Sequence, residues 1–239
     1  MSINAKVIGS KWIFKRKEDN TEGRKIKFKA RLVAKSFLQR ERIDYFEIFS
    51  PVVEHSSIQL LLAYAAYNDL HIEQLDVKTA FLHGDLNEKM YMKPLDGYPA
   101  EFKPNQACLL SKSLYGLKQA SGQWHLKFDS FMLGNKFTRS QYDACVSFKA
   151  TKTCIIYLLL YVDDMRIICK DVNLISSIKS QLKSNFEMKD LGVANEILGV
   201  EIIRDGPNKL LYLTQHPYVL KVLKRYMFET LKPVNIPLA

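Results

Sequence analysis

Three aspartates carry the most specific chemical signal in this 239-residue sequence. Asp163 and Asp164 directly follow its longest apolar run, Cys154–Val162, and Asp76 interrupts a shorter apolar stretch 87 residues before the pair. Adjacent residues of a strand point to opposite faces, so both carboxylates can approach one ion only where the chain begins to turn. Two carboxylates this close repel each other unless a cation lies nearby, and Mg²⁺ prefers oxygen ligands of this kind. The alternative interpretation is that Asp-Asp is ordinary hairpin-turn chemistry.

Asp76 favours the metal-dependent interpretation. Three carboxylates at the ends of neighbouring strands can hold two metal ions about 3.5–4 Å apart, as in enzymes that displace a group at phosphorus. One ion would activate an attacking hydroxyl, and the other would neutralise the leaving phosphate. Because basic residues are also available for phosphates and template, the combination indicates a polymerase.

The elements that must position these aspartates follow from the pattern of apolar residues. Strands are predicted at 11–17, 25–35, 71–77, 153–162, 165–169, 196–203 and 209–213. In the third strand, Leu75 and Val77 share one face while Gln74 and Asp76 share the other. Strands and helices do not alternate regularly, which predicts an α+β fold.

Four helices are expected between these strands. The first would be capped by Ser56 or Ser57 and would bury Leu60, Leu61, Tyr64 and Tyr67. The second would cover 115–133, bury Trp124, Phe128 and Phe131, and stop at Gly134. The third would be capped by Asn173 and carry Leu174, Ile178, Leu182 and Phe186 on one side. The last would start near Pro217 and bury Val219, Leu223 and Tyr226.

Charge is concentrated at the N-terminal end. Residues 1–40 hold twelve Lys or Arg and three acidic residues, which accounts for nearly all of the net charge of +10. A basic block joined to a neutral body is typical of proteins that bind nucleic acid, although a solvated basic hairpin is an equal alternative. The longest apolar run is too short to span a membrane, the first residues lack a signal peptide, and the four cysteines form no zinc motif. We therefore expect an intracellular protein in a reducing compartment.

Eight motifs, in order along the chain, resemble the reverse transcriptase of copia-type LTR retrotransposon Pol polyproteins, particularly those of plants. They are KWIF (11–14), KARLVAK (29–35), FSPVV (49–53), QLDVKTAFLHGD (74–85), SLYGLKQA (113–120), LYVDDM (160–165), FEMKDLG (186–192) and ILGVE (197–201). The resemblance implies an RNA-directed DNA polymerase of right-hand form, with fingers, a ferredoxin-like palm sheet and the start of a thumb. In one domain over 1–239, the fingers would take about 1–70 and part of 86–120, the palm 71–85 and 121–203, and the primer grip and thumb start 196–239.

The resemblance also implies roles for individual residues. Asp76, Asp163 and Asp164 would be the catalytic ligands of two Mg²⁺ ions, with Mn²⁺ as a substitute. Phe81 would be the steric gate against a ribonucleotide, and Lys29, Arg31, Tyr115 and Gly116 would line the deoxynucleotide site. Lys118 and Gln119 would contact the template, and Leu198, Gly199 and Glu201 would belong to the primer grip. For Lys29 and Arg31, a solvated strand face is an equal alternative.

The resemblance implies a template-primer and deoxynucleoside triphosphates as partners, no membrane, and a cytoplasmic retrotransposon particle. No RNase H or integrase sequence is present, so we expect a fragment of a polyprotein or a degraded genomic copy.

Five positions depart from the family pattern: Ser36 and Cys169 replace the usual Gly, Ser121 and Gly122 replace Pro and a following Arg, and Arg166 replaces an apolar residue. A buried Arg166 must reach solvent or a carboxylate, where it would compete with metal. A catalytically inactive remnant that binds nucleic acid is therefore the alternative to a working polymerase.

Overall fold

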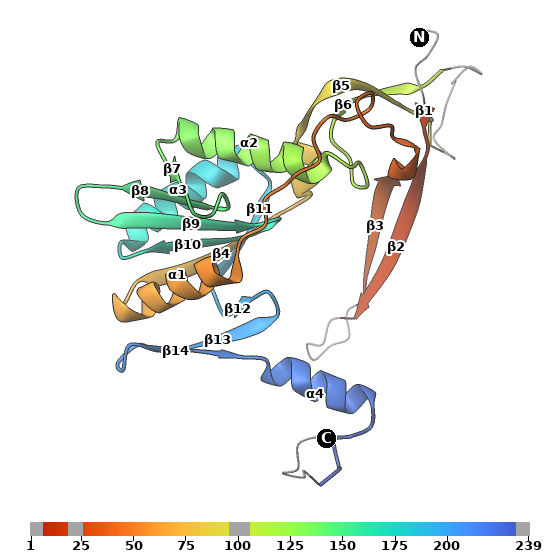
Figure 1. Ribbon diagram of the computed structural model, residues 1–239. Helices are drawn as coiled ribbons and strands as arrows, with labels where there is room; N and C mark the ends of the chain where they lie inside the picture. The colour runs from red at the N-terminus through yellow and green to blue at the C-terminus, as the bar shows by residue number, and fades with distance from the viewer. Residues whose placement is uncertain (1–6, 19–25, 96–105, 233–239) are drawn as a thin grey trace.

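A six-stranded antiparallel sheet forms the centre of the computed structural model, which describes residues 7–18, 26–95 and 106–232 (Figure 1). The strand order is β11 (Met188–Val193), β4 (His71–Val77), β10 (Asp164–Cys169), β9 (Ile155–Tyr161), β8 (Val146–Ala150) and β7 (Thr138–Arg139). Side chains alternate between the two faces of each strand, so the apolar residues of β4, β9 and β10 supply a core on both sides of the sheet.

Helices cover both faces of this central sheet. Helices α2 (Ala120–Gly134) and α3 (Val172–Asn185) pack on the face that carries Leu75 and Met165. Helix α1 (His55–Tyr67) packs on the face that carries Ile72 and Ile168, together with a small sheet of β12 (Glu196–Ile197), β13 (Val200–Asp205) and β14 (Leu210–Thr214). The catalytic candidates on β4 and β10 thus lie in the middle layer of a three-layer arrangement (Figure 1).

Two further sheets, built from the N-terminal strands and from two strands between residues 85 and 112, lie beside the central one (Figure 1). Strands β2 (Ser10–Glu18) and β3 (Ile26–Ala34) form a long hairpin, and β1 (Val7–Ile8), β5 (Asp85–Met92) and β6 (Cys108–Lys112) form a three-stranded sheet. Two short 3₁₀ helices, η1 (Ser36–Leu38) and η2 (Ala80–His83), connect these parts. A separate cluster that includes Ile8, Ala34, Met90 and Leu117 holds them together.

The mixed α+β class and most of the predicted strands are confirmed. The strands predicted at 71–77 and 165–169 match β4 and β10 within a residue, and Leu75 and Val77 are buried on one face as expected. The strand predicted at 196–203 is confirmed in part: β13 pairs with β14 as expected, but a turn at Leu198-Gly199 separates β13 from the short β12.

Two predicted helix faces are wrong. Helix α1 buries Ile58, Leu61, Leu62, Ala65 and Ala66, whereas Leu60, Tyr64 and Tyr67 are exposed. Since hydrophobic residues run round much of this helix, periodicity alone did not identify the buried stripe.

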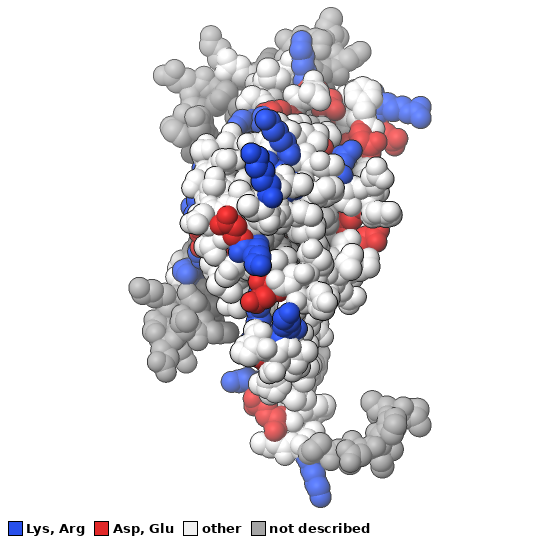
Figure 2. Space-filling view, turned by 90° about the vertical axis from the view of Figure 1, so that its left-hand side faces the viewer, with Lys and Arg blue, Asp and Glu red and all other residues white. Residues whose placement is uncertain are grey.

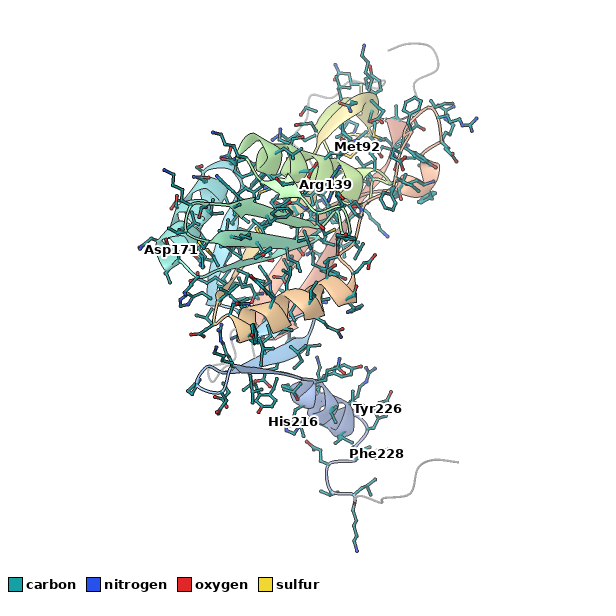
Figure 3. The ribbon with its side chains drawn as sticks, turned by 60° about the vertical axis from the view of Figure 1, so that its left-hand side comes forward. Met92, Arg139, Asp171, His216, Tyr226 and Phe228 are labelled. Carbon is teal, nitrogen blue, oxygen red and sulfur yellow. The ribbon has the colours of Figure 1, made fainter. Side chains whose placement is uncertain are left out.

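Helix α4 (His216–Arg225) starts next to Pro217 as predicted, but it buries none of its residues, Val219 and Leu223 included. Figure 3 shows Tyr226 and Phe228 at its far end, directed away from the central sheet. Of the side predicted to be buried, Val219 and Tyr226 are therefore exposed and Leu223 is half-buried.

Three predicted helix starts are also corrected. Helix α1 begins at His55 with Glu54 as its N-cap, so Ser56 and Ser57 lie inside the helix and do not cap it. Helix α2 begins at Ala120 instead of 115, because Gly116 has a φ of +90°, which ends any helical path. Helix α3 is capped by Asp171, whose side chain accepts hydrogen bonds from the amides of Asn173 and Leu174, so Asn173 is not the cap. Among the described residues, no helix has the length and apolar character needed to cross a membrane.

Candidate active site

The three aspartates identified from the sequence come together at one end of the central sheet. Asp76 is the next-to-last residue of β4, and Asp163 and Asp164 lie where β9 turns into β10. Asp164 is directly opposite Asp76 in the β10–β4 ladder, and the amide of Val77 donates to the carbonyl of Asp163 over 2.7 Å. Residues that are far apart in sequence thereby become neighbours through strand pairing.

A tight turn presents the aspartate pair. Tyr161 pairs with Asp164, and Val162 and Asp163 form the turn between them. Val162 has a φ of +56°, a left-handed conformation that β-branched residues rarely adopt. Its carbonyl accepts a 2.6 Å hydrogen bond from the indole Nε1 of Trp124 in α2. Helix α2 therefore helps to hold the turn in a strained conformation.

The negative charge of three neighbouring carboxylates at this end of the sheet favours the binding of a cation. Burial and the charges of Asp163 and Asp164 raise the pKa of Asp76, while Lys29 and Lys189 act in the opposite direction. Carboxylates that oppose each other's ionisation are relieved by a bound cation. Since carboxylate oxygens are the ligands that hard divalent ions favour, the donor atoms present fit Mg²⁺.

Arg166 is paired with one of the three aspartates. Its side chain is only 2% exposed, and its Nη1 donates to Oδ1 of Asp164 over 2.5 Å. The amide of Gln74 donates to the same oxygen over 3.0 Å. The expectation that a buried Arg166 reaches a carboxylate is thus confirmed. In the part of the chain that the structure describes, no three His, Cys, Asp or Glu side chains gather into a metal-binding group.

Asp76 and Asp163 line a cavity of about 680 Å³ between β3 and the end of β4. Lys29 and Arg31 of β3 and Tyr115 line the same cavity. The Arg31 guanidinium carbon is 5.5 Å from the centre of the Tyr115 ring, in a cation–π arrangement. The cavity therefore has carboxylates on one wall and basic groups on another, which suits a phosphorylated ligand accompanied by a divalent ion.

Gly116 allows Tyr115 to reach this cavity. At a φ of +90°, a Cβ on Gly116 would lie 2.4 Å from the carbonyl oxygen of Ala34, too close for any other residue. The amide of Ala34 in turn donates to the carbonyl of Tyr115 over 2.7 Å. The ring of Phe81 lies 5.2 Å from that of Tyr115, and Phe81 also packs against two core clusters.

Lys118 and Gln119 turn away from the cavity. Gln119 is 1% exposed, and its amide bonds to the side chain of Gln39 and to the carbonyl of Asp44. The Lys118 ammonium donates to the hydroxyl of Tyr45 over 3.0 Å. Both side chains hold the loop after β3 against the start of α2, and the buried Gln119 amide is not available to a template.

Leu198, Gly199 and Glu201 lie at the β12–β13 hairpin. Leu198 and Gly199 both have positive φ, at +52° and +77°, as a two-residue hairpin turn requires. A second hollow of about 830 Å³, lined by Gly199, Glu201 and Lys221 among others, lies between this hairpin and α4.

Three residues of the site carried no functional prediction: Gln74, Trp124 and Lys189. Gln74 shares a strand face with Asp76, which was a usable signal, and Trp124 was assigned to the core. Lys189 of β11 is opposite Asp76 in the β11–β4 ladder, and only the sheet order brings it there.

Comparison with known proteins places the chain in a family. A family model described as "Reverse transcriptase (RNA-dependent DNA polymerase)" matches residues 1–239. Over 96% of its length, the chain is 50% identical to a retrovirus-related Pol polyprotein from transposon TNT 1-94 of Nicotiana tabacum. Over 98% of its length, it is 38% identical to the Pol polyprotein from transposon RE1 of Arabidopsis thaliana and 37% identical to that from RE2.

The chain spans 16–17% of the length of these relatives, which are much longer polyproteins. The match nevertheless covers this chain from end to end, and it includes the paired strands that carry the aspartates. The chain therefore belongs to the reverse transcriptase (RNA-dependent DNA polymerase) family.

Proposed function

We propose that this chain is the RNA-directed DNA polymerase domain of a copia-type Pol polyprotein and adds deoxynucleotides to a primer 3′-hydroxyl. The observation that carries the proposal is that Asp76 and Asp163 share a cavity with Lys29 and Arg31. Carboxylates beside basic groups suit the transfer of a nucleotidyl group from a triphosphate, a reaction that depends on positioning and charge more than on covalent chemistry.

Asp76 and Asp163 would hold Mg²⁺, with Mn²⁺ as a substitute, and a second ion would need Asp164 as well. When bound, the metal lowers the pKa of an attacking hydroxyl and offsets negative charge at phosphorus. Lys29 and Arg31 would bind the triphosphate and orient its α-phosphorus toward the primer. Phe81, beside Tyr115, would exclude a ribonucleotide by contact with its 2′-hydroxyl.

In this proposal the central sheet with α2 and α3 is the palm, and the β2–β3 hairpin with the β1-β5-β6 sheet is the fingers. The β12–β13 hairpin is the primer grip, where Leu198, Gly199 and Glu201 would contact the primer, and α4 begins the thumb. Gly116 would let the backbone approach the nucleotide, and Lys118 would position that segment through Tyr45. The reaction would take place in a cytoplasmic particle.

A second candidate function is nucleic-acid binding without catalysis. The observation that favours it is the pairing of Arg166 with Asp164, because a carboxylate that already holds a guanidinium is a weaker metal ligand. The basic β2–β3 hairpin would serve both functions.

Extension of a DNA primer on an RNA template by the purified 239-residue chain, with deoxynucleotides and Mg²⁺, tests the proposal. We expect extension that falls by about 100-fold or more in Asp76→Asn and in Asp163→Asn. Asp85→Asn, which removes an exposed carboxylate paired with Lys127, is the matched control and should keep its activity. Extension that survives Asp163→Asn would refute the site. RNA binding without extension in the wild type would support the second candidate.

A further inference from the structure

Arg166 is a fully buried cation between two functional elements. Its Nη1 contacts Oδ1 of Asp164 and the carbonyl of Met165, the latter over 3.1 Å, and its Nη2 donates to the carbonyl of Glu196. Asp164 begins β10, whereas Glu196 begins β12 of the hairpin on the neighbouring layer. One guanidinium therefore joins the aspartate turn to the β12–β13 hairpin.

The contact engages one of the two carboxylate oxygens of Asp164. Its Oδ1 already accepts hydrogen bonds from Arg166 and from Gln74, and a divalent ion at that oxygen would lie next to a buried positive charge. The planar fork of Arg fixes two acceptors at once, which a single ammonium does not do. The Nε of Arg166 is buried without a hydrogen-bond partner. Such an unsatisfied donor is unfavourable, so the hydrogen bonds of the two Nη atoms must offset its cost.

We infer that Arg166 is a tethered cation that takes Asp164 out of the metal-binding set and anchors the β12–β13 hairpin to the aspartate turn. A divalent ion then binds through Asp76 and Asp163, while Asp164 pairs with the guanidinium of Arg166. The inference rests on the proposed function only in its choice of metal ligands, and it assigns Arg166 a positioning role.

Binding of Mn²⁺ alone, measured by electron paramagnetic resonance without primer, template or nucleotide, tests the metal part. We expect Arg166→Leu to tighten Mn²⁺ binding about 10-fold and Asp164→Asn to change it by less than about 3-fold, while Asp76→Asn and Asp163→Asn weaken it about 10-fold. An Arg166→Leu variant that binds as the wild type does, or an Asp164→Asn variant as weak as Asp76→Asn, would overturn the inference. Because Asp164→Asn is nearly isosteric, it serves even if Arg166→Leu folds poorly.

Amide hydrogen exchange over residues 196–205 tests the anchoring part. We expect faster exchange in Arg166→Leu and in Arg166→Lys, whereas Mn²⁺ affinity should stay low in Arg166→Lys because the charge remains. Arg204→Lys is the matched control: Arg204 holds the same hairpin through Asp69 over 2.7 Å and through the carbonyl of Leu70. It should loosen the hairpin without changing Mn²⁺ affinity. Unchanged exchange in Arg166→Leu would contradict the anchor. Neither Mn²⁺ binding nor amide exchange requires polymerase activity, so both tests remain valid if the chain does not extend a primer.

A second, independent observation concerns two thiols at the opposite end of the β9–β10 hairpin. The Sγ atoms of Cys154 and Cys169 are 3.5 Å apart. Cys154 is partly exposed and touches the hydroxyl of Thr151, while Cys169 is buried. Burial raises the pKa of Cys169 to about 11; burial also acts on Cys154, but contacts with Thr151 and Cys169 lower its pKa. The accessible thiol is thus the more reactive of the two.

We propose that Cys154 and Cys169 form a disulfide when a peroxide oxidises the chain. The Cys154 thiolate attacks one oxygen of hydrogen peroxide, which breaks the O–O bond and leaves a sulfenic acid. The released hydroxide takes up the proton that the Cys154 thiol had lost and becomes water. The Cys169 sulfur then attacks this sulfur, the S–S bond forms, and the hydroxyl group departs as water with the Cys169 proton. In total, the two thiols lose two electrons and two protons, and one hydrogen peroxide is reduced to two waters.

Thiol titration and peptide mass spectrometry of the native chain after hydrogen peroxide treatment test this proposal. We expect the four thiols to fall to two and a peptide that links 154 to 169 to appear. The link should be lost in Cys154→Ser and kept in Cys108→Ser, which removes the other partly exposed thiol. A link that is missing while Cys108 is oxidised, or one that persists in Cys154→Ser, would refute the pair.

Discussion

Asp76, Asp163 and Asp164 are identical side chains with different surroundings. Asp76 and Asp163 face the cavity, and Asp76 titrates at a raised pKa because it is partly buried beside two other carboxylates. Asp164 instead binds Arg166 and Gln74. At the scale of the residue, the neighbours of each carboxylate decide whether it is open to an ion or already paired.

The raised pKa of Asp76 predicts that Asp76→Asn stabilises the metal-free protein. A carboxyl group whose pKa is raised in the folded state destabilises that state once the group is ionised. The free energy of unfolding of the wild type therefore falls as pH rises from the unfolded pKa through the folded pKa. We therefore expect a higher free energy of unfolding for Asp76→Asn at pH 7 in urea titrations with chelator. The difference should vanish below the unfolded pKa of 3.8. A variant less stable than the wild type at pH 7 would contradict this explanation.

Gly116→Ala is expected to destabilise the protein by about 2–4 kcal/mol, because Ala would occupy a left-handed conformation against the Ala34 carbonyl. Urea unfolding measures the change. Gly134→Ala is the matched control: it lies in the last turn of α2 with no atom within 4 Å of a new Cβ, so it should stabilise by up to about 1 kcal/mol. Equal effects at the two positions would show that backbone geometry is not the reason for Gly116.

At the scale of the element, helices hold the strands that carry the site. Trp124 of α2 bonds to the turn before the aspartates, and Lys179 of α3 reaches Glu73 of β4 and Asp190 of β11. Gly122 lets α2 approach the chain closely, since a Cβ there would lie 2.9 Å from the carbonyl oxygen of Phe49. The glycine that departs from the family pattern thus has a packing reason in this chain.

The contact between α3 and the sheet predicts a specific loss of stability in acid. Burial opposes ionisation of Asp190, but hydrogen bonds from Lys179 and Lys183 lower its pKa to about 2. A lowered pKa contributes stability above the unfolded value of 3.8, and that stability is lost as pH falls toward 2. We expect Asp190→Asn to lose about 1 kcal/mol at pH 7, a reduced value because the carboxylate is partly exposed.

The same unfolding experiment should show the deficit of Asp190→Asn disappear between pH 4 and pH 2. Asp85→Asn, which breaks the exposed pair with Lys127, should change stability by less than about 0.5 kcal/mol. A deficit of Asp190→Asn that is independent of pH would indicate a packing defect instead of a lost ion pair.

At the scale of the whole molecule, charge is separated between the β2–β3 hairpin and the body. The hairpin register places Lys11, Lys15, Lys27, Lys29 and Arg31 on one face, and the last two line the cavity. On the side of the molecule shown in Figure 2, by contrast, basic and acidic residues are mixed. In the proposed function, this basic hairpin would hold a polyanion next to the cavity.

This arrangement predicts how RNA binding depends on salt. Replacing Lys11, Lys15 and Lys27 together by Gln should weaken binding of single-stranded RNA and lower the slope of log K against log salt by about 2, if each lysine neutralises one phosphate. Fluorescence anisotropy at several salt concentrations measures the slope. The matched control replaces Lys136, Lys152 and Lys170 by Gln, which removes the same charge at positions outside the hairpin. Equal slopes for the two triple variants would refute a local binding face.

Most strands, the α+β class and the family could be predicted from the sequence, because alternation and motif spacing are local properties of the chain. The errors fall where local patterns leave alternatives. Helix α1 has apolar residues around much of its surface, and the turn at Leu198-Gly199 interrupts a run that reads as one strand. For the site, the strand-end position of Asp76 and the Asp163-Asp164 pair indicated candidates, whereas the burial of Gln119 depends on a loop about 80 residues away.

By itself, the sequence determined the three aspartates, the basic hairpin and the reverse transcriptase resemblance, since each depends on residue type and spacing. Tertiary structure decided the rest. The pairing of β10 with β4 set Asp164 opposite Asp76, and the packing of β12 on that sheet gave Arg166 a carbonyl acceptor at Glu196. Hydrogen bonds and ion pairs depend on distances of a few ångströms between elements, and local sequence patterns do not encode those distances. The pairing of Asp164 with Arg166 and Gln74 therefore depends on the folded structure and could not be established from the sequence.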